Sequence, residues 1–277
     1  MSTRIGEAFS RAAREGRAAF IPYITAGYPS PKTCLDLIRV LEENGADLIE
    51  LGLPFSAPLA DGPVVRRSFQ AALAAGLTPF KVLELAAQAR EAVKAPLLMM
   101  TYWGPVREIG PARFAAQARE AGISGVIVPD LPSEEEAPWL AILVHLGLSH
   151  IFLLARSTPP DRRRLVFHKA RGFLYYAALD GPTGGKIKVT ASLLEDLVAV
   201  RAEAGLPVAV GFGVRSPTQA GKLARAADGV VVGSAVLREI MKHGEPGEQV
   251  AAAARFTVAM TRALRKDGAK NHDPTHR

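Results

Sequence analysis

Residues 48–63 read LIELGLPFSAPLADGP, which places one carboxylate, Glu50, inside an apolar run and a second, Asp61, in the segment after it. Apolar runs of this kind are typical of buried parallel strands, whose side chains are covered on both faces of the sheet. Burial without a partner destabilises a charged carboxylate and raises its pKa. A carboxyl group with a raised pKa at the end of a strand is suited to exchange protons near neutral pH. The alternative is a structural Glu50 paired with a basic residue, and this stretch alone does not decide between the two.

The composition of the chain is that of an ordinary globular protein, with 277 residues, 48% hydrophobic and 22% charged. This length allows two domains, although α/β barrels of about 250 residues fold as one. No stretch approaches the ~20 consecutive apolar residues that cross a bilayer, and the first residues lack the apolar core of a secretory signal. The single cysteine, Cys34, cannot form an internal disulfide. We therefore expect a cytoplasmic protein in which Cys34 is a buried structural thiol.

The net charge of +7 raises the question of a nucleic-acid partner. The basic residues are scattered, and no aromatic side chains interleave with them for base stacking. One cluster, residues 162–164, follows two prolines and an aspartate and is typical of the exposed face of a helix. The end of the chain, residues 267–277, is polar and is expected to be a disordered tail. We therefore expect no nucleic acid and no membrane as partners, and a basic surface that attracts a phosphorylated small molecule.

Short β-rich apolar runs alternate with segments of helical period along the whole chain, a pattern typical of βα units around a parallel sheet. The expected strands are residues 19–25, 47–51, 96–101, 125–128, 150–154, 173–178, 207–211 and 229–232. The helices expected between them include residues 31–43, 78–92, 111–121, 191–204 and 217–226. Eight strands predict a closed (β/α)8 TIM barrel that forms one domain over residues 1–266, with a further helix at 5–15 that covers its bottom. An open doubly wound sheet is the alternative, but it usually has fewer strands and a glycine fingerprint after the first.

A barrel predicts where the chemistry lies, because such enzymes hold their active sites at the carboxyl ends of the strands. Glu50 lies at the end of the second expected strand and Asp61 follows it, so the fold favours a functional role for both. The six histidines show no metal-ligand spacing, and the chain has one cysteine. We therefore expect no catalytic metal.

The same end of a barrel often holds phosphate, through loops after the seventh and eighth strands and a short helix N-terminus. The matching segments here are residues 211–213 and 233–235. Glycine lets backbone N–H groups approach an anion, and Ser234 is expected both to cap the helix and to donate its hydroxyl. A third glycine-rich segment, residues 180–185, follows the sixth strand. Together the three segments predict a phosphate site.

Six segments spread along nearly the whole sequence read PYITAGYP at 22–29, ELGLPFS at 50–56, DGP at 61–63, PDLP at 129–132, GFG at 211–213 and GSA at 233–235. In their order and spacing they resemble the α subunit of tryptophan synthase. Members of this family cleave indole-3-glycerol phosphate to indole and glyceraldehyde 3-phosphate, without a metal or an organic cofactor. The resemblance implies a lyase of tryptophan biosynthesis with the same requirements.

The resemblance also implies roles for individual residues. Glu50 matches the family's general acid/base, which protonates indole C3 and removes the proton of the adjacent glycerol hydroxyl. Asp61 matches the carboxylate that stabilises positive charge on the ring nitrogen, and Tyr175 matches an active-site tyrosine. The positions that contact phosphate correspond to Gly184, Gly213, Gly233 and Ser234. The indole pocket corresponds to Tyr23, Met100, Tyr102, Ile127, Pro129 and Phe212.

The chain departs from the family at several positions. The family usually has Asp where this chain has Ala57, and Asn where it has Gly104. In the family both positions belong to the surface that meets the β subunit, so their loss predicts that coupling to a β partner is weakened or absent. The segment at 179–184 differs through an added negative charge and a stiffening proline. Arg215 stands where a small hydroxyl residue is common.

Three functions follow from these observations. The preferred one is an indole-3-glycerol phosphate lyase, either a divergent α subunit or a stand-alone enzyme. The second is a non-catalytic, regulatory homologue that binds a β-type partner, against which the presence of Glu50 and Asp61 speaks. The third is another phosphosugar barrel enzyme, such as an isomerase, against which the context of residues 61–63 speaks.

Overall fold

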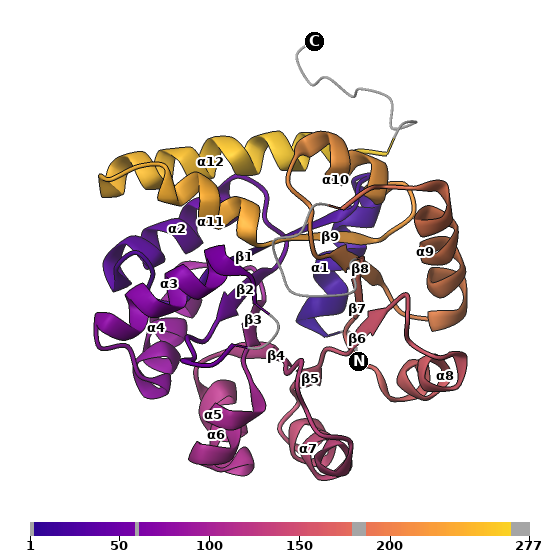
Figure 1. Ribbon diagram of the computed structural model, residues 1–277, viewed down its shortest axis with the longest axis horizontal. Helices are drawn as coiled ribbons and strands as arrows, with labels where there is room; N and C mark the ends of the chain where they lie inside the picture. The colour runs from indigo at the N-terminus through magenta and orange to yellow at the C-terminus, as the bar shows by residue number, and fades with distance from the viewer. Residues whose placement is uncertain (1–2, 59–60, 179–186, 267–277) are drawn as a thin grey trace.

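The computed structural model describes residues 3–58, 61–178 and 187–266. Its strands form one sheet in the order β5-β4-β3-β2-β1-β9-β8-β7-β6 (Figure 1). All neighbouring strands pair in parallel. The strands are β1 (Ala19–Thr25), β2 (Ile49–Gly52), β3 (Leu97–Met100), β4 (Ile123–Ile127), β5 (Ser149–His150), β6 (Leu153–Ala155), β7 (Leu174–Ala177), β8 (Val208–Gly211) and β9 (Gly229–Val232).

The sheet closes into a barrel because its two edge strands, β5 and β6, are successive pieces of one extended stretch. The backbone between them changes partner. The Ile151 N–H donates to the Val126 carbonyl on β4 at 2.9 Å, and the Phe152 carbonyl accepts from the Tyr175 N–H on β7 at 2.9 Å. The sequence predicts a single fifth strand at residues 150–154, and the structure divides it at this change of partner. The fold is therefore the expected (β/α)8 TIM barrel.

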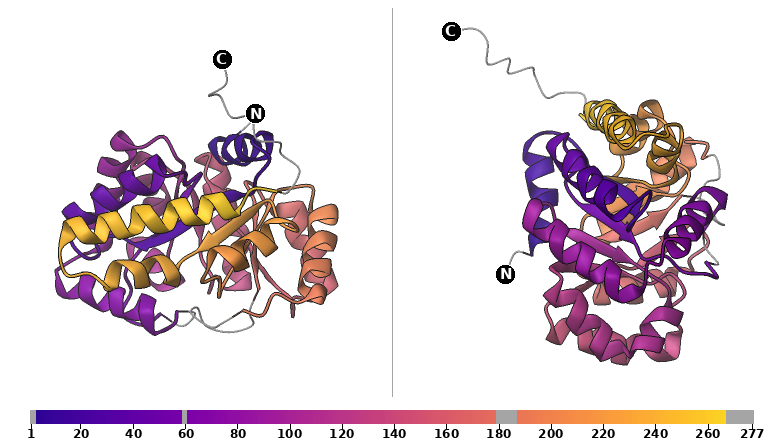
Figure 2. Two further views of the ribbon diagram at one scale, coloured as in Figure 1. Left: turned by 90° about the horizontal axis from the view of Figure 1, so that it is seen from above. Right: turned by 90° about the vertical axis from the view of Figure 1, so that its left-hand side faces the viewer.

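Helices surround the barrel (Figures 1 and 2). They are α1 (Arg4–Arg14), α2 (Pro31–Glu43), α3 (Pro63–Ala74), α4 (Pro79–Ala92), α5 (Trp103–Ile109), α6 (Pro111–Glu120), α7 (Ser133–His145), α8 (Pro160–Lys169), α9 (Ala191–Ala204), α10 (Pro217–Ala224), α11 (Ser234–Met241) and α12 (Pro246–Ala263). The local sequence explains their starts: α2, α4 and α10 have proline in the first turn, and Ser30, Thr78 and Ser216 cap them through side-chain oxygens. The elements β1, β9, α2 and α9 begin and end where the sequence predicts them.

Helix α1 covers the amino-terminal end of the barrel. Ile5 and Phe9 pack into the apolar cluster that fills the barrel interior. The ring centroids of Phe9 and Phe173 lie 5.3 Å apart. A Cβ atom on Gly229 would come within 2.9 Å of the Phe9 ring, so the close approach of α1 to β9 requires glycine there. This arrangement confirms the helix that the sequence predicts at the bottom of the barrel.

The last helix, α12, spans 18 residues and lies along the outside of the barrel (Figure 2). It packs against α2, α10 and α11 and buries Ala252, Ala253 and Met260. None of the helices within the described ranges has the combination of length and apolarity that a membrane span requires. The tail expected at residues 267–277 lies outside the described residues.

The arginine run at residues 162–164 is not simply the exposed helix face that the sequence suggests. Arg162 forms an ion pair with Glu136 on α7. The Arg163 Nη1 atom lies 2.8 Å from Oδ1 of Asp196 on α9, and the Arg163 side chain is only 17% exposed. The run therefore ties α8 to the helices on either side of it, which is a structural role.

Candidate active site

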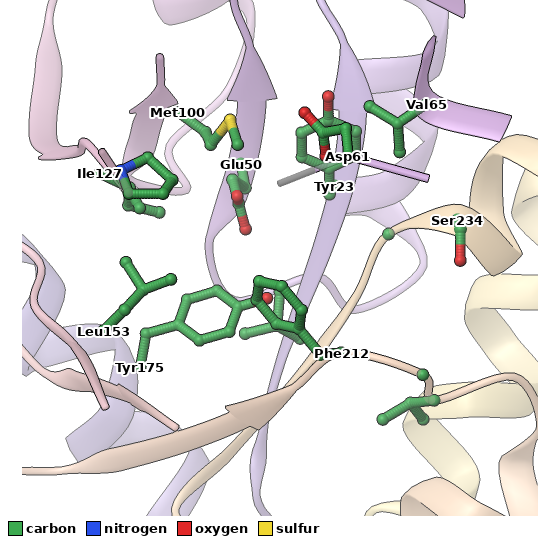
Figure 3. A pocket seen from close by; sticks show the side chains of 15 residues that line it. Tyr23, Glu50, Asp61, Val65, Met100, Ile127, Leu153, Tyr175, Phe212 and Ser234 are labelled. Carbon is green, nitrogen blue, oxygen red and sulfur yellow. The ribbon is translucent and has the colours of Figure 1, made fainter. Parts of the chain in front are cut away.

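A cavity opens at the carboxyl ends of the strands, where the barrel fold predicts it (Figure 3). It is lined by Tyr23, Glu50, Asp61, Val65, Met100, Ile127, Pro129, Leu153, Tyr175, Phe212, Gly213, Val214, Val231, Gly233 and Ser234. Of the site residues predicted from the sequence, Tyr102 does not line this cavity and Gly184 lies outside the described residues. The other predicted residues come together here from separate strands and loops.

Glu50 projects from β2 into the cavity, and its surroundings are mostly apolar (Figure 3). The residue is 5% exposed, and within the described part of the chain its Oε2 atom is buried without a hydrogen-bond partner. No ion pair to Glu50 is formed by the residues that the structure describes, which speaks against the structural reading of this carboxylate. Burial, and secondly the nearby Asp61, raise the pKa of Glu50 to about 8. The carboxyl group is therefore poised to exchange protons near neutral pH.

Asp61 is also buried, at 4% exposed, and its carboxylate is bonded to Tyr102. The Tyr102 hydroxyl donates to Asp61 Oδ2 at 2.7 Å. Tyr102 is fully buried, and its ring centroid lies 5.5 Å from that of Phe55. Tyr102 is not among the residues that line this cavity, and its hydroxyl is bonded to Asp61, which does line it. That Tyr102 belongs to the indole pocket stays a prediction.

Two tyrosines, Tyr23 on β1 and Tyr175 on β7, place their hydroxyls beside glycines on neighbouring strands. A Cβ atom on Gly52 would lie 2.0 Å from the Tyr23 hydroxyl oxygen, and one on Gly211 would lie 2.4 Å from that of Tyr175. Both glycines therefore make room for a tyrosine. The Tyr175 ring packs edge-on against Phe212, with centroids 5.5 Å apart. Burial raises the pKa of both tyrosines well above the ordinary value, so their hydroxyls stay protonated.

The loops after β8 and β9 form another part of the cavity wall, with Gly213, Gly233 and Ser234. Phe212 and Gly213 both have left-handed backbone, with φ of 67° and 89°. Turns that bring successive backbone N–H groups to one side make concavities that bind anions. A residue other than glycine is strained in this region by about 1–3 kcal/mol, and such strain concentrates at functional sites. Phe212 meets that description.

Ser234 does not cap helix α11 as the sequence suggests. The N-cap residue is Gly233, which has no side chain to make a capping hydrogen bond. Ser234 is the first helical residue, it is 7% exposed, and it lines the cavity. Its hydroxyl oxygen accepts from Nη1 of Arg238, one turn along the helix, at 3.4 Å. The start of α11 thus presents backbone N–H groups without a side-chain cap, which suits it to an anion.

The apolar wall contains both predicted and unpredicted residues. Tyr23, Met100, Ile127, Pro129 and Phe212 line the cavity as expected. Val65, Leu153, Val214 and Val231 also line it and were not predicted. Their signal in the sequence is weak, because an apolar residue in or beside a strand or helix is typical of ordinary core. Leu153 reaches the cavity because β6 pairs it with Tyr175, which is a consequence of the divided fifth strand.

Cys34 is buried on α2, outside the cavity. Its thiol lies 3.8 Å from the Thr25 carbonyl oxygen, to which it donates. Burial raises the pKa of the thiol to about 12, so it is a poor nucleophile. The expectation of a buried structural thiol is confirmed.

Comparison with known proteins points to one family. The model of the family described as tryptophan synthase alpha chain matches residues 9–265. The tryptophan synthase alpha chain of Geobacter sulfurreducens is 41% identical over 264 residues, which cover 95% of this chain and 99% of the relative. That of Dechloromonas aromatica is 44% identical over 241 residues, which cover 87% and 90%.

Solved structures agree with the sequence comparisons. The tryptophan synthase alpha chain from Legionella pneumophila superposes with a TM-score of 0.87 at 33% identity, covering 97% of this chain and 100% of that chain. A chain of tryptophan synthase from Mycobacterium tuberculosis superposes with a TM-score of 0.86 at 34% identity, covering 96% and 100%. Both similarities extend over the barrel and its surrounding helices.

Proposed function

Because the chain belongs to the tryptophan synthase alpha chain family, we propose that it cleaves indole-3-glycerol phosphate to indole and glyceraldehyde 3-phosphate, as a lyase of tryptophan biosynthesis. Among this chain's own residues, the state of the Glu50 carboxyl group is the observation that supports this function. It faces the cavity, its Oε2 atom has no partner within the described residues, and its pKa is raised to about 8. No observation favours the regulatory homologue or the isomerase over the lyase.

In the proposed reaction one carboxyl group serves two proton transfers. Protonated Glu50 donates its proton to indole C3, which leaves positive charge on the ring nitrogen. The Asp61 carboxylate stabilises that charge. The bond between C3 and the adjacent glycerol carbon then breaks, its electron pair returns to the indole ring, and the hydroxyl on that carbon becomes an aldehyde. Glu50, now a carboxylate, takes the hydroxyl proton and is protonated again.

Tyr175 is the third residue proposed to touch the reacting part of the substrate. Its hydroxyl stays protonated, because burial raises its pKa and the nearby Glu50 and Asp61 raise it further. A protonated hydroxyl beside two carboxyl groups is able to donate a hydrogen bond to a substrate oxygen. The packing of its ring against Phe212 holds it in place.

The two ends of the substrate are assigned to different walls of the cavity. We assign the phosphate to Gly213, Gly233 and Ser234, with Gly184, which lies outside the described residues, as the fourth predicted contact. The left-handed backbone at 212–213 and the uncapped start of α11 support this assignment. The indole ring is assigned to the apolar wall, to which Tyr23, Met100, Ile127, Pro129 and Phe212 belong. We also assign Leu153 to the apolar wall, and we propose that Tyr102 holds Asp61 in position.

We further propose that activation by a β subunit is weak in this protein. Ala57 is exposed in the loop after β2, and its uncharged side chain cannot form an ion pair with a partner. Gly104 lies in the first turn of α5, where a Cβ atom would come within 3.1 Å of Phe55 Cζ. Gly104 therefore leaves room for the Phe55 ring and presents no polar side chain. The cytoplasm is the proposed location, since the one cysteine is buried and forms no disulfide.

A steady-state assay of indole release by the isolated chain tests both proposals. We expect cleavage of indole-3-glycerol phosphate by the chain alone, and at most a few-fold increase when a purified β subunit is added. No indole release under either condition would reject the lyase. Activation by orders of magnitude would reject the weak coupling and leave the lyase standing.

A further inference from the structure

A second cavity, which we call the amino-terminal cavity, lies at the end of the barrel opposite to the one that Glu50 faces. It lies between the first turn of α1, the ends of α4 and α6, and the first residues of β4 and β5. Its volume of about 390 Å³ is within the range of small-molecule sites. Three of the residues that line it are arginines, Arg4, Arg90 and Arg119, and one is acidic, Glu120. The proposed reaction uses none of these side chains.

Two of the arginines are fixed by the backbone that follows α4. Arg4 Nη2 donates to the Lys94 carbonyl oxygen at 2.6 Å. Arg90 Nη1 donates to the Val93 carbonyl oxygen. Gly122 makes room for the second side chain, because a Cβ atom there would come within 2.5 Å of Arg90 Cγ. A guanidinium group has five N–H donors, so each of the two retains donors for a ligand.

The positive charge of these arginines is only partly compensated. Burial and then repulsion from Arg90 lower the pKa of Arg4. Glu7 and Glu42 act in the opposite direction and do not cancel this effect. The Glu42 carboxylate is itself bonded to the backbone, since its Oε1 atom accepts from two N–H groups between α4 and β3 at 2.8 and 2.6 Å. Arg119 forms no hydrogen bond or ion pair with the residues that the structure describes. An anion bound here would relieve the repulsion between the guanidinium groups.

A buried hydroxyl group is independent evidence for a ligand. Ser149, the first residue of β5, lines the cavity and is only 5% exposed. Its hydroxyl forms no hydrogen bond within the described part of the chain. A buried hydroxyl without a partner is destabilising, and a bound acceptor would satisfy it.

The ends of the neighbouring helices offer another explanation for part of this arrangement. Positive side chains in the last turn stabilise a helix, which accounts for Arg90 on α4 and Arg119 on α6 without a ligand. It does not account for Arg4, which lies in the first turn of α1, where the helix dipole disfavours positive charge. It does not account for the Ser149 hydroxyl either.

We propose that the amino-terminal cavity binds a phosphate group, either as free inorganic phosphate or as part of a small phosphorylated compound. The phosphate is contacted by three guanidinium groups and the buried hydroxyl, which belong to Arg4, Arg90, Arg119 and Ser149. A guanidinium group binds phosphate oxygens through paired N–H donors. Phosphate suits this donor set better than a carboxylate, because it has at least three acceptor oxygens and a charge of up to about −2 at neutral pH. The site lies apart from the catalytic cavity, so it does not rest on the proposed function.

Titration calorimetry with inorganic phosphate measures binding, and the inhibition of indole release by phosphate reports separately on the catalytic cavity. In Arg119→Gln we expect the dissociation constant of the amino-terminal cavity to rise about tenfold or more, the range of a hydrogen bond to a charged group. The inhibition constant stays as in wild type. Arg119 is exposed, so its replacement is expected to preserve the fold. Ser149→Ala removes only the hydroxyl and is expected to raise the same dissociation constant about threefold to tenfold.

A matched control and two further ligands complete the series. Arg113→Gln removes the same charge from an exposed position on α6 that does not line the cavity, and it is expected to leave both constants unchanged. Glycerol 2-phosphate distinguishes the two sources of the phosphate group. Tighter binding than that of inorganic phosphate identifies a phosphorylated compound as the occupant, and weaker binding identifies the free anion. Acetate, a carboxylate, is expected to bind at least about tenfold more weakly than either.

Several outcomes would overturn this inference. Arg119→Gln might bind phosphate as tightly as wild type, or Arg113→Gln might weaken binding equally, which would show that binding follows net charge alone. Acetate that binds as tightly as phosphate would exclude a phosphate site. An inhibition constant that rises in Arg119→Gln as much as the dissociation constant would show that both report the catalytic cavity. If the wild-type chain released no indole, the proposed function would fail, and calorimetry would still decide whether the amino-terminal cavity binds phosphate.

Discussion

Asp47 and Glu50 lie close together in the sequence and are both buried, at 1% and 5% exposed, yet they sit in opposite surroundings. Asp47, at the amino-terminal end of the barrel, accepts from Arg17 Nη2 at 2.9 Å and from the Phe20 N–H at 2.9 Å. A second guanidinium group lies nearby, with Nη2 of Arg11 3.5 Å from Asp47 Oδ1. Glu50 faces the other end of the barrel, where its Oε2 atom has no partner among the described residues.

The difference teaches that burial alone does not mark a catalytic carboxylate. A buried carboxylate that is fully paired stabilises the fold, as Asp47 does by joining β1, the stretch before β2 and the Arg17 turn. A buried carboxylate without a partner keeps a raised pKa and is available to a substrate. In this barrel the paired carboxylate of Asp47 lies at the amino-terminal end and Glu50 faces the carboxyl end. This agrees with the fold in general, in which the amino-terminal end contributes stability and the carboxyl end holds the active site.

The largest expected effect is the loss of turnover in Glu50→Gln. Glutamine has nearly the same shape but cannot exchange protons, so kcat is expected to fall about 10²- to 10⁴-fold. Indole release measures it, and circular dichroism checks that the variant is folded. Glu43→Gln, on the exposed side of α2, is the matched control and is expected to behave as wild type. Near-normal turnover by Glu50→Gln would refute the proposed mechanism.

Asp47→Ala is expected to break the fold and spare the chemistry. Removal of this carboxylate leaves Arg17, whose side chain is 13% exposed, without its main partner, and breaking a buried pair costs about 3–5 kcal/mol. The free energy of unfolding in guanidinium chloride measures this loss, and kcat per folded molecule stays unchanged. Asp47→Asn, which retains one acceptor oxygen, is the milder variant for the case that the alanine variant does not fold. A variant as stable as wild type but low in turnover would reverse the roles assigned here.

The raised pKa of Glu50 also makes the stability of the protein depend on pH. The pKa of Glu50 rises from an ordinary 4.5 to about 8 in the folded protein. The folded state therefore holds this proton more tightly than the unfolded chain, so the contribution of Glu50 to stability is complete below pH ~4.5 and is lost as the pH rises to ~8.

Glu50→Gln removes this dependence. Relative to wild type the variant is expected to gain stability between pH 5 and pH 8.5, on the order of a few kcal/mol in total. Denaturant midpoints of both proteins across this range measure the difference. Parallel curves for the two proteins would show that the folded and unfolded states bind the Glu50 proton equally well.

The smallest expected effect concerns the support of Asp61. Tyr102→Phe removes the hydroxyl that donates to Asp61 Oδ2 at 2.7 Å, so kcat/KM is expected to fall about tenfold. The chain offers a matched control in Tyr176, whose hydroxyl donates to Asp196 outside the cavity. Tyr176→Phe is expected to lower stability by about 1 kcal/mol and to leave turnover unchanged. Equal turnover in the two variants would show that the Tyr102 hydroxyl does not contribute to catalysis.

The sequence by itself determined the features that depend on neighbouring residues. The alternation of apolar strands with capped helices predicts the barrel, and β1, β9, α2 and α9 have the predicted bounds because their periodicity and caps are local. The sequence also shows Glu50 inside an apolar strand, because this feature too depends only on neighbouring residues. A glycine-rich loop after each of the last strands likewise predicts a phosphate site, which stays a prediction.

Only the tertiary structure decided which groups meet. It paired Asp47 with Arg17, placed the Tyr102 hydroxyl on Asp61, and brought Leu153 into the cavity through the divided fifth strand. It also gave Glu50 Oε2 no partner within the part of the chain that the structure describes. Each of these contacts joins residues that are far apart in the sequence. Local propensity carries no information about such partners, because the energy of a hydrogen bond or of a buried charge depends on what the closed barrel brings beside it.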